Sequence, residues 1–215
     1  TIMFLQAWQF TCGEKEDYSK YKPAVNYIGE FTSDGYVQPY GDTPLDDEAV
    51  GEYVYLNIIN KAKDYIYINT PYLIVDNELV TALTLAAKSG VDVIIVTPHI
   101  EDKWYVHLVT RAYYAQLIEA GIKIYEYTPG FIHSKTFVSD DKIGVVGTIN
   151  MDYRSLYLHF ENGVLLYKTK SVMEIKEDFI ETLKVCQRIS IEDCNRIKWS
   201  NKFITSILRV FAPLM

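Results

Sequence analysis

The sequence predicts an α/β domain in which helices cover both faces of a mixed β-sheet. Between residues 45 and 127, extended apolar runs alternate with segments whose apolar residues recur at helical spacing, which is the pattern of strand–helix repeats. The run Val91–Thr97 is almost continuously apolar, as expected of a strand that is buried on both faces. After Thr128, three strands are expected in succession, and a hairpin among them would make the sheet mixed.

Residues 1–44 are expected to lead into the domain, which then occupies residues 45–215. Residues 1–12 have the pattern of the end of a helix, and Gly13–Pro44 is polar with scattered glycine and proline. This composition is typical of a linker, with one strand around Gly35–Tyr40. The chain opens inside an apolar pattern and without a signal peptide, so we expect this segment to link from an absent N-terminal half.

The strand–helix repeat begins at residue 45, and capping residues bound its helices. Asp76 suits the N-cap of a helix that runs to Ser89, and Gly90 suits the stop after it. Gly121 would stop the next helix in the same way. The predicted elements are the helix Leu45–Lys63, the strand Tyr65–Thr70, the helix after Asp76, the strand Val91–Thr97, the helix Lys103–Ala120 and the strand Ile122–Tyr127.

The C-terminal part is expected to add strands first and helices afterwards. Asp141 and Lys142 would turn the hairpin between the first two strands. The predicted elements are the strands Ile132–Ser139, Gly144–Gly147 and Asn162–Tyr167, followed by helices at about Ser171–Arg188 and Glu192–Phe211.

Composition narrows the possible functions. Of the 215 residues, 49% are hydrophobic and 23% are charged, which is ordinary for a soluble globular protein. The net charge of −7 argues against sequence-independent nucleic-acid binding, because that needs a basic surface. The three cysteines show no metal-ligand spacing, so we expect reduced thiols and neither a metal nor another cofactor. No apolar run reaches the ~18 residues of a membrane-spanning helix.

The stretch from Phe131 to Glu161 contains the candidate site. Its β-branched residues favour an extended chain, and the alternation of side chains then places His133 and Lys135 on one face of a strand. An imidazole beside an ammonium group suits a negatively charged ligand such as a phosphate. At a phosphodiester, neutral His133 can attack phosphorus or protonate a leaving oxygen, while Lys135 stabilises the non-bridging oxygens.

Further residues can complete this site without a metal. The turn at Gly147 and Thr148 would place Asn150, whose side-chain N–H can donate to the same phosphate oxygens. Gly147 would let the backbone come close to the ligand. Glu161, on the following strand, could hold the other nitrogen of His133 and stabilise the imidazolium.

Asp140 admits two interpretations. It lies at a strand end beside a turn, where aspartate is common as a simple turn residue. It could equally tie down the strand that carries His133. A lone histidine on a strand is usually packed or solvated, so the candidate site depends on the joint spacing of these residues.

This spacing resembles a known family. His133, Lys135, Asp140, Gly147-Thr148 and Asn150 are similar to the HKD motif of the phospholipase D superfamily, and most similar to the second motif, in the C-terminal half, of bacterial cardiolipin synthases. The chain departs from the usual motif where Ser134 and Ile149 replace alanine and where His159 replaces asparagine. The resemblance covers nearly the whole chain and continues in Tyr67–Tyr72, Ser89–Asp92, Thr110–Tyr114, Glu119–Ile122 and Arg209–Leu214.

The resemblance implies a phospholipase D-like fold and one half of a two-motif active site. Cardiolipin synthases of this type join two phosphatidylglycerol molecules and release glycerol, with one histidine as nucleophile and the other as acid and base. By resemblance, His133 would be the acid and base. The implied partners are phosphatidylglycerol, a membrane surface at the cytoplasmic face, and either the missing N-terminal half or a second copy of the chain.

Two other functions stay open. The chain could be a single-motif phosphodiesterase or nuclease that pairs two copies of His133, or it could only bind phosphate or lipid once separated from its other half. The amphipathic stretch Asn195–Met215 could lie at a lipid interface or pack on its own domain. Pro71–Ile74 could line a lipid entry or pack under a helix.

Overall fold

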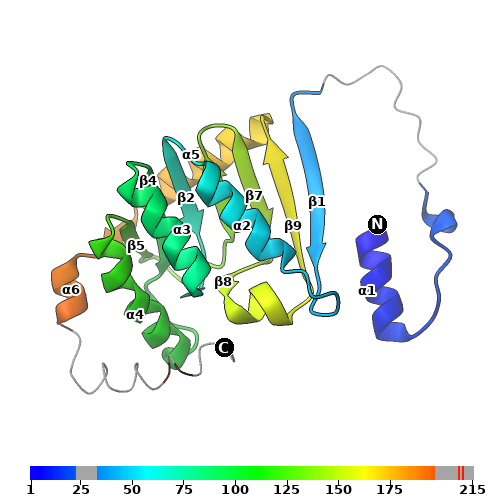
Figure 1. Ribbon diagram of the computed structural model, residues 1–215, viewed down its shortest axis with the longest axis horizontal. Coiled ribbons are helices and arrows are strands. Elements are labelled where there is room, and N and C mark those ends of the chain that lie inside the picture. Colours follow the sequence, from blue (N-terminus) through cyan, green and yellow to red (C-terminus); the bar gives the residue numbers. More distant parts are fainter. Residues whose placement is uncertain (23–32, 197–207, 209, 211–215) are drawn as a thin grey trace. The chain divides into compact units, whose positions relative to one another are not determined.

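The computed structural model describes residues 1–22, 33–196, 208 and 210 (Figure 1). The chain divides into two compact units, Thr1–Asp34 and Gly35–Met215. The first unit contains α1 (Ile2–Cys12), which confirms the helix expected at residues 1–12, and a 3-10 turn at Tyr18–Tyr21. α1 ends at Gly13, whose φ of 71° lies in the left-handed region that glycine adopts without strain.

In the described part of the second unit, eight strands form one mixed sheet. β2, β4 and β5 are parallel to one another, and every other neighbouring pair is antiparallel. A separate pair joins β3 (Leu73–Ile74) to β8 (Met151–Asp152) in parallel. The sheet order is β1 (Tyr36–Asp42), β9 (Glu161–Tyr167), β7 (Ile143–Gly147), β6 (Thr136–Ser139), β2 (Tyr65–Asn69), β4 (Asp92–Pro98), β5 (Lys123–Tyr127) and β10 (Cys186–Arg188).

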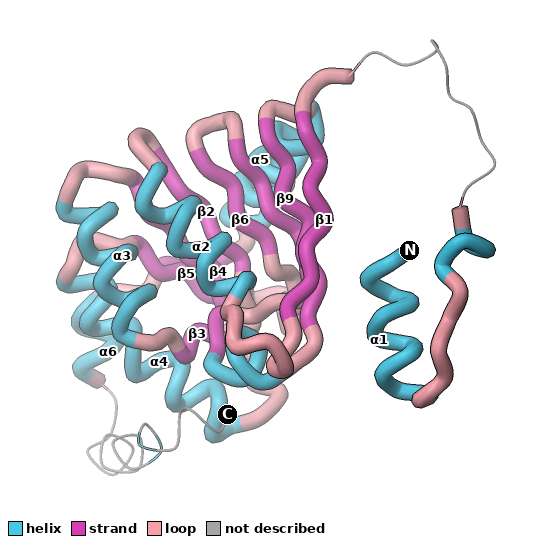
Figure 2. Tube along the Cα trace, turned by 45° about the vertical axis from the view of Figure 1, so that its right-hand side comes forward, coloured by secondary structure: helices cyan, strands magenta, loops and turns pink. Residues whose placement is uncertain are grey.

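Helices cover both faces of this sheet, as the sequence predicts. α2 (Val50–Lys61), α3 (Asn77–Lys88) and α4 (Trp104–Glu119) lie on one face, and α5 (Lys170–Leu183) lies on the other (Figures 1 and 2). The α/β class with a mixed sheet is therefore confirmed.

The alternation of side chains in the strands explains this layering. In β2 and β4, Ile66, Ile68, Val93 and Ile95 point into the core beneath α2, α3 and α4. Their sequence neighbours Tyr67, Ile94 and Val96 instead pack with Phe179 of α5. Because both faces are apolar, these strands read as nearly continuous apolar runs. Each fully buried aliphatic side chain contributes roughly 1.5–3 kcal/mol of transfer free energy.

The edge of the sheet that carries the candidate site follows from this topology. β2, β4 and β5 are parallel, so their C-terminal ends meet at one edge of the sheet. β6 runs antiparallel to β2, and β9 runs antiparallel to β7, so β6 and β9 begin at that same edge. The residues before β6, between β7 and β9, and after β2 are thereby brought together, at the edge where α/β sheets commonly place ligands.

The N-terminal boundary of the sheet differs from the expected domain start at residue 45. The strand expected around Gly35–Tyr40 is present as β1, and it pairs along its whole length with β9. The polar composition around this strand made it look like part of the linker, although an edge strand of a sheet needs only one apolar face.

Three elements between β5 and the C-terminus were not predicted. β8 and the π-helical turn η2 (Arg154–Leu158) interrupt the chain between β7 and β9, where no helix was expected. The helix predicted to reach Arg188 is wrong beyond Leu183, because Cys186–Arg188 instead pairs with the free edge of β5 as β10. A capping box at Ser190 starts α6 (Ile191–Asn195). Most of the helix predicted at Glu192–Phe211, and of the amphipathic stretch 195–215, lies outside the described residues.

Candidate active site

His133 and Lys135 lie at the site edge, immediately before β6 and not within it. The prediction of a strand that begins at Ile132 is wrong at its start, because regular pairing begins at Thr136. One further backbone hydrogen bond, from the Gly147 N–H to the Lys135 carbonyl at 3.3 Å, joins the segment just before β6 to the end of β7.

Lys135 is a buried ammonium group, only 8% exposed. Its Nζ donates to the His133 carbonyl oxygen at 2.8 Å, so the two residues of the motif are joined through their own backbone. Burial lowers the pKa of Lys135, while the nearby carboxylates of Glu161 and Asp152 oppose that shift. Lys135 is therefore a buried positive charge that one carbonyl holds by a hydrogen bond and that two carboxylates favour electrostatically.

His133 is exposed to solvent at the mouth of the site. Its ring lies 5.9 Å from that of Phe131. Partial burial and the charge of Lys135 lower its pKa, and the carboxylate of Asp102 opposes this shift. The lowered pKa favours the uncharged imidazole at neutral pH, which is the form that can attack an electrophile or accept a proton.

Asn150 is positioned by the short segment between β7 and β8. The Ile149 carbonyl accepts a hydrogen bond from the Tyr55 hydroxyl at 2.7 Å, and the Met151 N–H donates to Thr70 Oγ1 at 3.2 Å. The Asn150 amide donates from Nδ2 to Asp152 Oδ2 at 3.1 Å. Its Oδ1 is buried and has no hydrogen-bond partner among the described residues.

Glu161 lies at the start of β9 and is 8% exposed. The hydrogen bond expected from His133 to this carboxylate is not formed in the described part of the chain. Instead, Thr148 Oγ1 donates a short hydrogen bond to Glu161 Oε2, and His159 Nδ1 lies 3.8 Å from Oε1. Burial raises the pKa of Glu161, and the hydrogen bond from Thr148 opposes the shift.

Gly147 lies where β7 and β9 approach each other closely. A Cβ at this position would lie 2.5 Å from the Asn162 carbonyl oxygen and 2.9 Å from the Gly163 Cα. The absence of a side chain therefore allows this close approach of the two strands. Thr148 continues this contact, because its N–H donates to the Asn162 carbonyl at 2.9 Å.

Asp140 lies at the opposite end of β6 from His133, so the structure does not bring it to the site. Its carboxylate accepts hydrogen bonds from the backbone N–H groups of Lys63, Asp64 and Tyr65 at 2.9, 3.0 and 3.0 Å. These bonds lower its pKa. Of the two interpretations of Asp140, the one in which it ties down the strand matches this geometry.

Asp152 is a site residue that the sequence analysis missed. It is 5% exposed and accepts from the Asn150 amide and from the Ser155 N–H, the latter at 2.7 Å. Burial raises its pKa. A carboxylate two residues after Asn150 was visible in the sequence, but its contact with Asn150 depends on β8 and η2, which no periodicity indicated.

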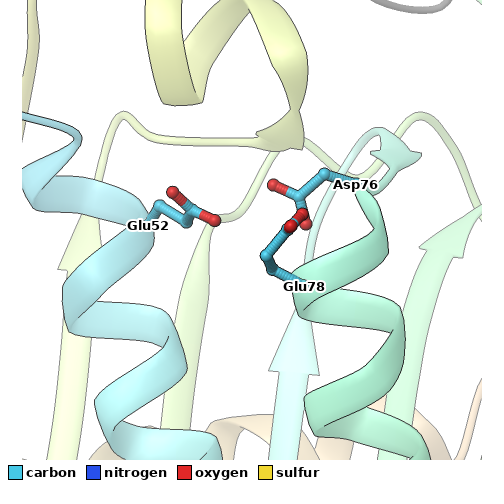
Figure 3. Close-up of side chains that lie close together, drawn as sticks. All are labelled: Glu52, Asp76 and Glu78. Carbon is cyan, nitrogen blue, oxygen red and sulfur yellow. The ribbon is translucent and has the colours of Figure 1, made fainter.

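A second group of acids lies at the start of α3, across from α2. Glu52, Asp76 and Glu78 each bring one carboxylate oxygen within 4.8 Å of the others (Figure 3). Asp76 is the N-cap of α3, as predicted, because its Oδ1 accepts from the Leu79 N–H at 2.8 Å; its other oxygen accepts a short hydrogen bond from the Tyr157 hydroxyl. Burial and the charge of Asp76 raise the pKa of Glu52 to about 7.

Every helix in the described residues is too short or too polar to cross a lipid bilayer.

Two known bacterial proteins resemble this chain in sequence over its whole length. A protein named cardiolipin synthase from Halalkalibacterium halodurans is 37% identical over 215 residues, which cover the whole chain and 42% of that protein. An uncharacterized protein from Streptococcus mutans is 47% identical over the whole chain and 46% of its own length. The chain thus spans less than half the length of these relatives.

Solved structures share the fold. The phosphatidylserine synthase of Haemophilus influenzae superimposes with a TM-score of 0.64 at 15% identity, over 83% of this chain and 45% of that one. Nuc from Salmonella typhimurium, a phospholipase D family member, gives a TM-score of 0.61 at 20% identity, over 72% of this chain and 97% of that one. At these identities the likeness concerns the fold alone.

Residues 55–183 match the family model described as "Cardiolipin synthase, PLD-like domain". This match covers more than half of the chain and includes His133, Lys135, Asn150 and Glu161. The chain therefore belongs to the family of the phospholipase D-like domain of cardiolipin synthases.

Proposed function

We propose that this chain is the C-terminal half of a membrane-associated cardiolipin synthase and supplies one of its two catalytic histidines. The observation that carries the proposal is the pairing of neutral His133 with the buried charge of Lys135 at the ligand edge of the sheet. The identity to proteins named cardiolipin synthase and the share of their length that the chain spans support it.

The proposed reaction has two displacements at one phosphorus. A histidine nitrogen attacks the phosphorus of phosphatidylglycerol, the bond from phosphorus to the glycerol oxygen breaks, and the second histidine protonates the departing glycerol. The hydroxyl of a second phosphatidylglycerol then loses its proton to that histidine and attacks the same phosphorus. The phosphorus–nitrogen bond breaks, which yields cardiolipin and the free histidine.

The residues of this chain would have different roles in the reaction. His133 would be the acid and base, and the first motif, in the other half or in a second copy, would provide the nucleophile. Lys135 and Asn150 would stabilise the negative charge that develops on the non-bridging oxygens. Glu161 would act through Lys135, because the charge of that carboxylate favours the ammonium form of the buried lysine.

Three residues of the motif would act by positioning. Gly147 and Thr148 hold the start of β9 against β7, which brings Glu161 to the site. Asp140 would anchor the far end of β6 and with it the segment that carries His133. The reaction is written without a metal or another cofactor, since these side chains supply the charge and the proton transfers it requires.

The decisive experiment compares the full-length protein, the 215-residue chain and a full-length His133→Ala variant. Each is incubated with phosphatidylglycerol vesicles and, separately, with DNA. We expect cardiolipin and glycerol from the full-length protein only. Cleavage of DNA by the 215-residue chain, lost in a His133→Ala version of it, would instead establish the alternative of a homodimeric nuclease.

A further inference from the structure

The loop between β4 and α4 carries an acid, Asp102, that lies outside the motif of His133. Both carboxylate oxygens of Asp102 are engaged: Oδ2 accepts a hydrogen bond from the Tyr72 hydroxyl at 2.5 Å, and Oδ1 accepts from the Lys103 N–H at 2.6 Å. Tyr72 immediately precedes β3, and its carbonyl oxygen accepts from Thr70 Oγ1 at 2.8 Å. The side chain of Asp102 is exposed to solvent and is nevertheless held in one orientation.

A buried polar network fixes the other end of this loop. His99 follows β4; its N–H donates to the Tyr127 carbonyl at 3.0 Å, and its Nδ1 donates to Glu126 Oε2 at 2.7 Å. Glu126 is completely buried and also accepts two hydrogen bonds from Arg111 of α4, at 2.7 and 2.6 Å. Burial opposes ionisation of this carboxyl group, but the bonds from Arg111 outweigh burial and lower its pKa. Such charge-assisted hydrogen bonds are strong, so the loop is anchored at His99 as well as at Asp102.

A row of ring contacts leads from Asp102 to the imidazole of His133. The ring of Tyr72, whose hydroxyl binds Asp102, lies 6.3 Å from the ring of Phe131, measured between centroids. The ring of Phe131 lies 5.9 Å from that of His133. Both distances are ordinary for packed aromatic rings. The loop that carries Asp102 and the segment that carries His133 therefore meet at the same edge of the sheet.

The charge of Asp102 favours protonation of His133. Burial, followed by the charge of the neighbouring lysine, lowers the pKa of His133, and in the part of the chain that the structure describes Asp102 is the carboxylate that raises it. Glu161, the acid that was expected to hold His133, is instead engaged by the side chains of Thr148 and Ser155. Because a carboxylate near an imidazole favours the imidazolium, Asp102 has the effect that was expected of Glu161.

We infer that Asp102, held by Tyr72, is the carboxylate that stabilises the imidazolium of His133 during phosphatidyl transfer. Under the proposed function, on which this inference rests, His133 takes the proton of the incoming hydroxyl as its oxygen attacks phosphorus. The positive charge that this creates on the imidazole is offset by Asp102. The proton stays on the imidazole, and the carboxylate touches neither the substrate nor the phosphorus. Asp102 is thus a positioning residue that acts through His133.

The first test is an NMR pH titration of the His133 ring protons in the 215-residue chain. Asp102→Asn keeps the shape and an acceptor oxygen for Tyr72 but removes the charge, so the pKa of His133 should fall. Glu101→Gln is the matched control at the preceding exposed acid, because burial lowers the pKa of His107 while the charge of Glu101 raises it. This control should lower the pKa of His107 and leave that of His133 unchanged.

Two further variants separate charge from position. Tyr72→Phe removes the hydroxyl that holds Asp102, so the pKa of His133 should fall by less than in Asp102→Asn. Asp102→Glu keeps the charge and should leave the pKa of His133 closer to that of the unchanged chain than Asp102→Asn does. An unchanged His133 pKa in Asp102→Asn, or an equal fall in Glu101→Gln, would overturn the inference.

The second test measures cardiolipin formation by the full-length protein. Asp102→Asn should reduce kcat about 2- to 5-fold, the range for an interaction with an exposed charge, with little change in KM. The limb of the pH–rate profile that titrates with His133 should move to lower pH, and Asp102→Glu should recover most of the rate. A loss of rate with an unshifted profile would show a merely structural role for Asp102 and overturn the inference.

The outcome is separable from that of the proposed function. If the full-length protein makes cardiolipin but Asp102→Asn leaves the pKa of His133 unchanged, only the inference fails. If that pKa falls as expected but the full-length protein makes no cardiolipin, Asp102 remains the electrostatic partner of His133 and the proposed reaction fails.

Discussion

Among single residues, Lys135 carries a buried charge directly beside His133. The ammonium group donates to the His133 carbonyl, and the charges of Glu161 and Asp152 favour its protonated form. Its charge opposes protonation of the imidazole, which is one of the two causes of the lowered His133 pKa. Under the proposed function, Lys135 thus both offers a charge to a phosphate and favours the neutral form of the neighbouring histidine.

Lys135→Met should raise the pKa of His133. Methionine keeps most of the volume but removes the charge that opposes the imidazolium, so the pKa moves up toward its ordinary value. Because burial is the larger cause of the shift, we expect a rise of less than about one unit. An NMR pH titration of the His133 ring protons measures it, with Lys88→Met as the control. A fall in the His133 pKa would contradict the arrangement.

At the level of elements, the turn between β6 and β7 is anchored to the start of β2. Asp140 has a φ of 54°, in the left-handed region where aspartate is tolerated better than most residues. Its carboxylate satisfies three successive backbone N–H groups that lead into β2. This side chain therefore anchors the turn after β6 to the start of β2, and the segment before β6 carries His133.

Asp140→Ala should lower the free energy of unfolding by about 2–4 kcal/mol, because three N–H groups lose their acceptor and alanine is strained at this φ. Asp140→Asn keeps one acceptor oxygen and tolerates the backbone, so it should cost about half as much. The lowered pKa of Asp140 means that its contribution is present above the unfolded pKa and is lost as pH falls through the folded one. Urea unfolding at pH 7 and pH 3 measures both effects, and Asp178→Ala on α5 is the control. Equal stability of both variants and the unchanged chain at pH 7 would contradict the anchoring role.

The carboxylates of Glu52 and Asp76 connect α2 to the start of α3, and the Tyr157 hydroxyl connects Asp76 to η2. The folded pKa of Glu52, about 7, is above the ordinary glutamate value of 4.5. A raised carboxyl pKa stabilises the fold below the unfolded pKa, and this stabilisation is lost as pH rises through the folded pKa. Ionisation of Glu52 beside Asp76 and Glu78 therefore weakens the fold between about pH 4.5 and pH 7.

Glu52→Gln should remove this pH dependence. We expect the variant to be more stable than the unchanged chain at pH 8, by about 1 kcal/mol after allowance for solvent screening, and equally stable at pH 4.5. Thermal unfolding at the two pH values measures the difference. Glu177→Gln, on the exposed side of α5, should leave the pH dependence intact. A variant that is less stable than the unchanged chain at pH 8 would show that Glu52 contributes favourably when ionised.

The sequence predicted most of these elements because their signals are local. Asp76 and Gly90 bound α3, and the apolar run around Val93 marks a strand covered on both faces. The missed elements depend on contacts between distant parts of the chain. β8 has only two residues and exists because it pairs with β3, and β10 forms because β5 offers it a free edge. The contacts of Asp152 and Glu161 could not be predicted for the same reason.

For the whole molecule, the exposed position of His133 suits a site completed by another histidine. The chain spans 42% of the length of the Halalkalibacterium halodurans cardiolipin synthase, and under the proposed function the remainder supplies the first motif, with the other histidine. A site divided in this way lets one histidine carry the phosphatidyl group while the other transfers protons. A variant that lacks His133 should therefore behave differently depending on whether His133 is the nucleophile or the acid and base.

If His133 is the acid and base, the full-length His133→Ala variant should still form the covalent phosphatidyl-histidine on the other motif. We expect this adduct when the substrate carries a good leaving group such as p-nitrophenol, because departure of that group needs no proton. Release of cardiolipin should be at least 10²-fold slower, since the incoming hydroxyl then lacks its base. Acid-quenched mass spectrometry detects the adduct, and Lys88→Met is the control. Loss of the adduct in the His133→Ala variant, with its fold intact, would make His133 the nucleophile and reverse the assignment of the two halves.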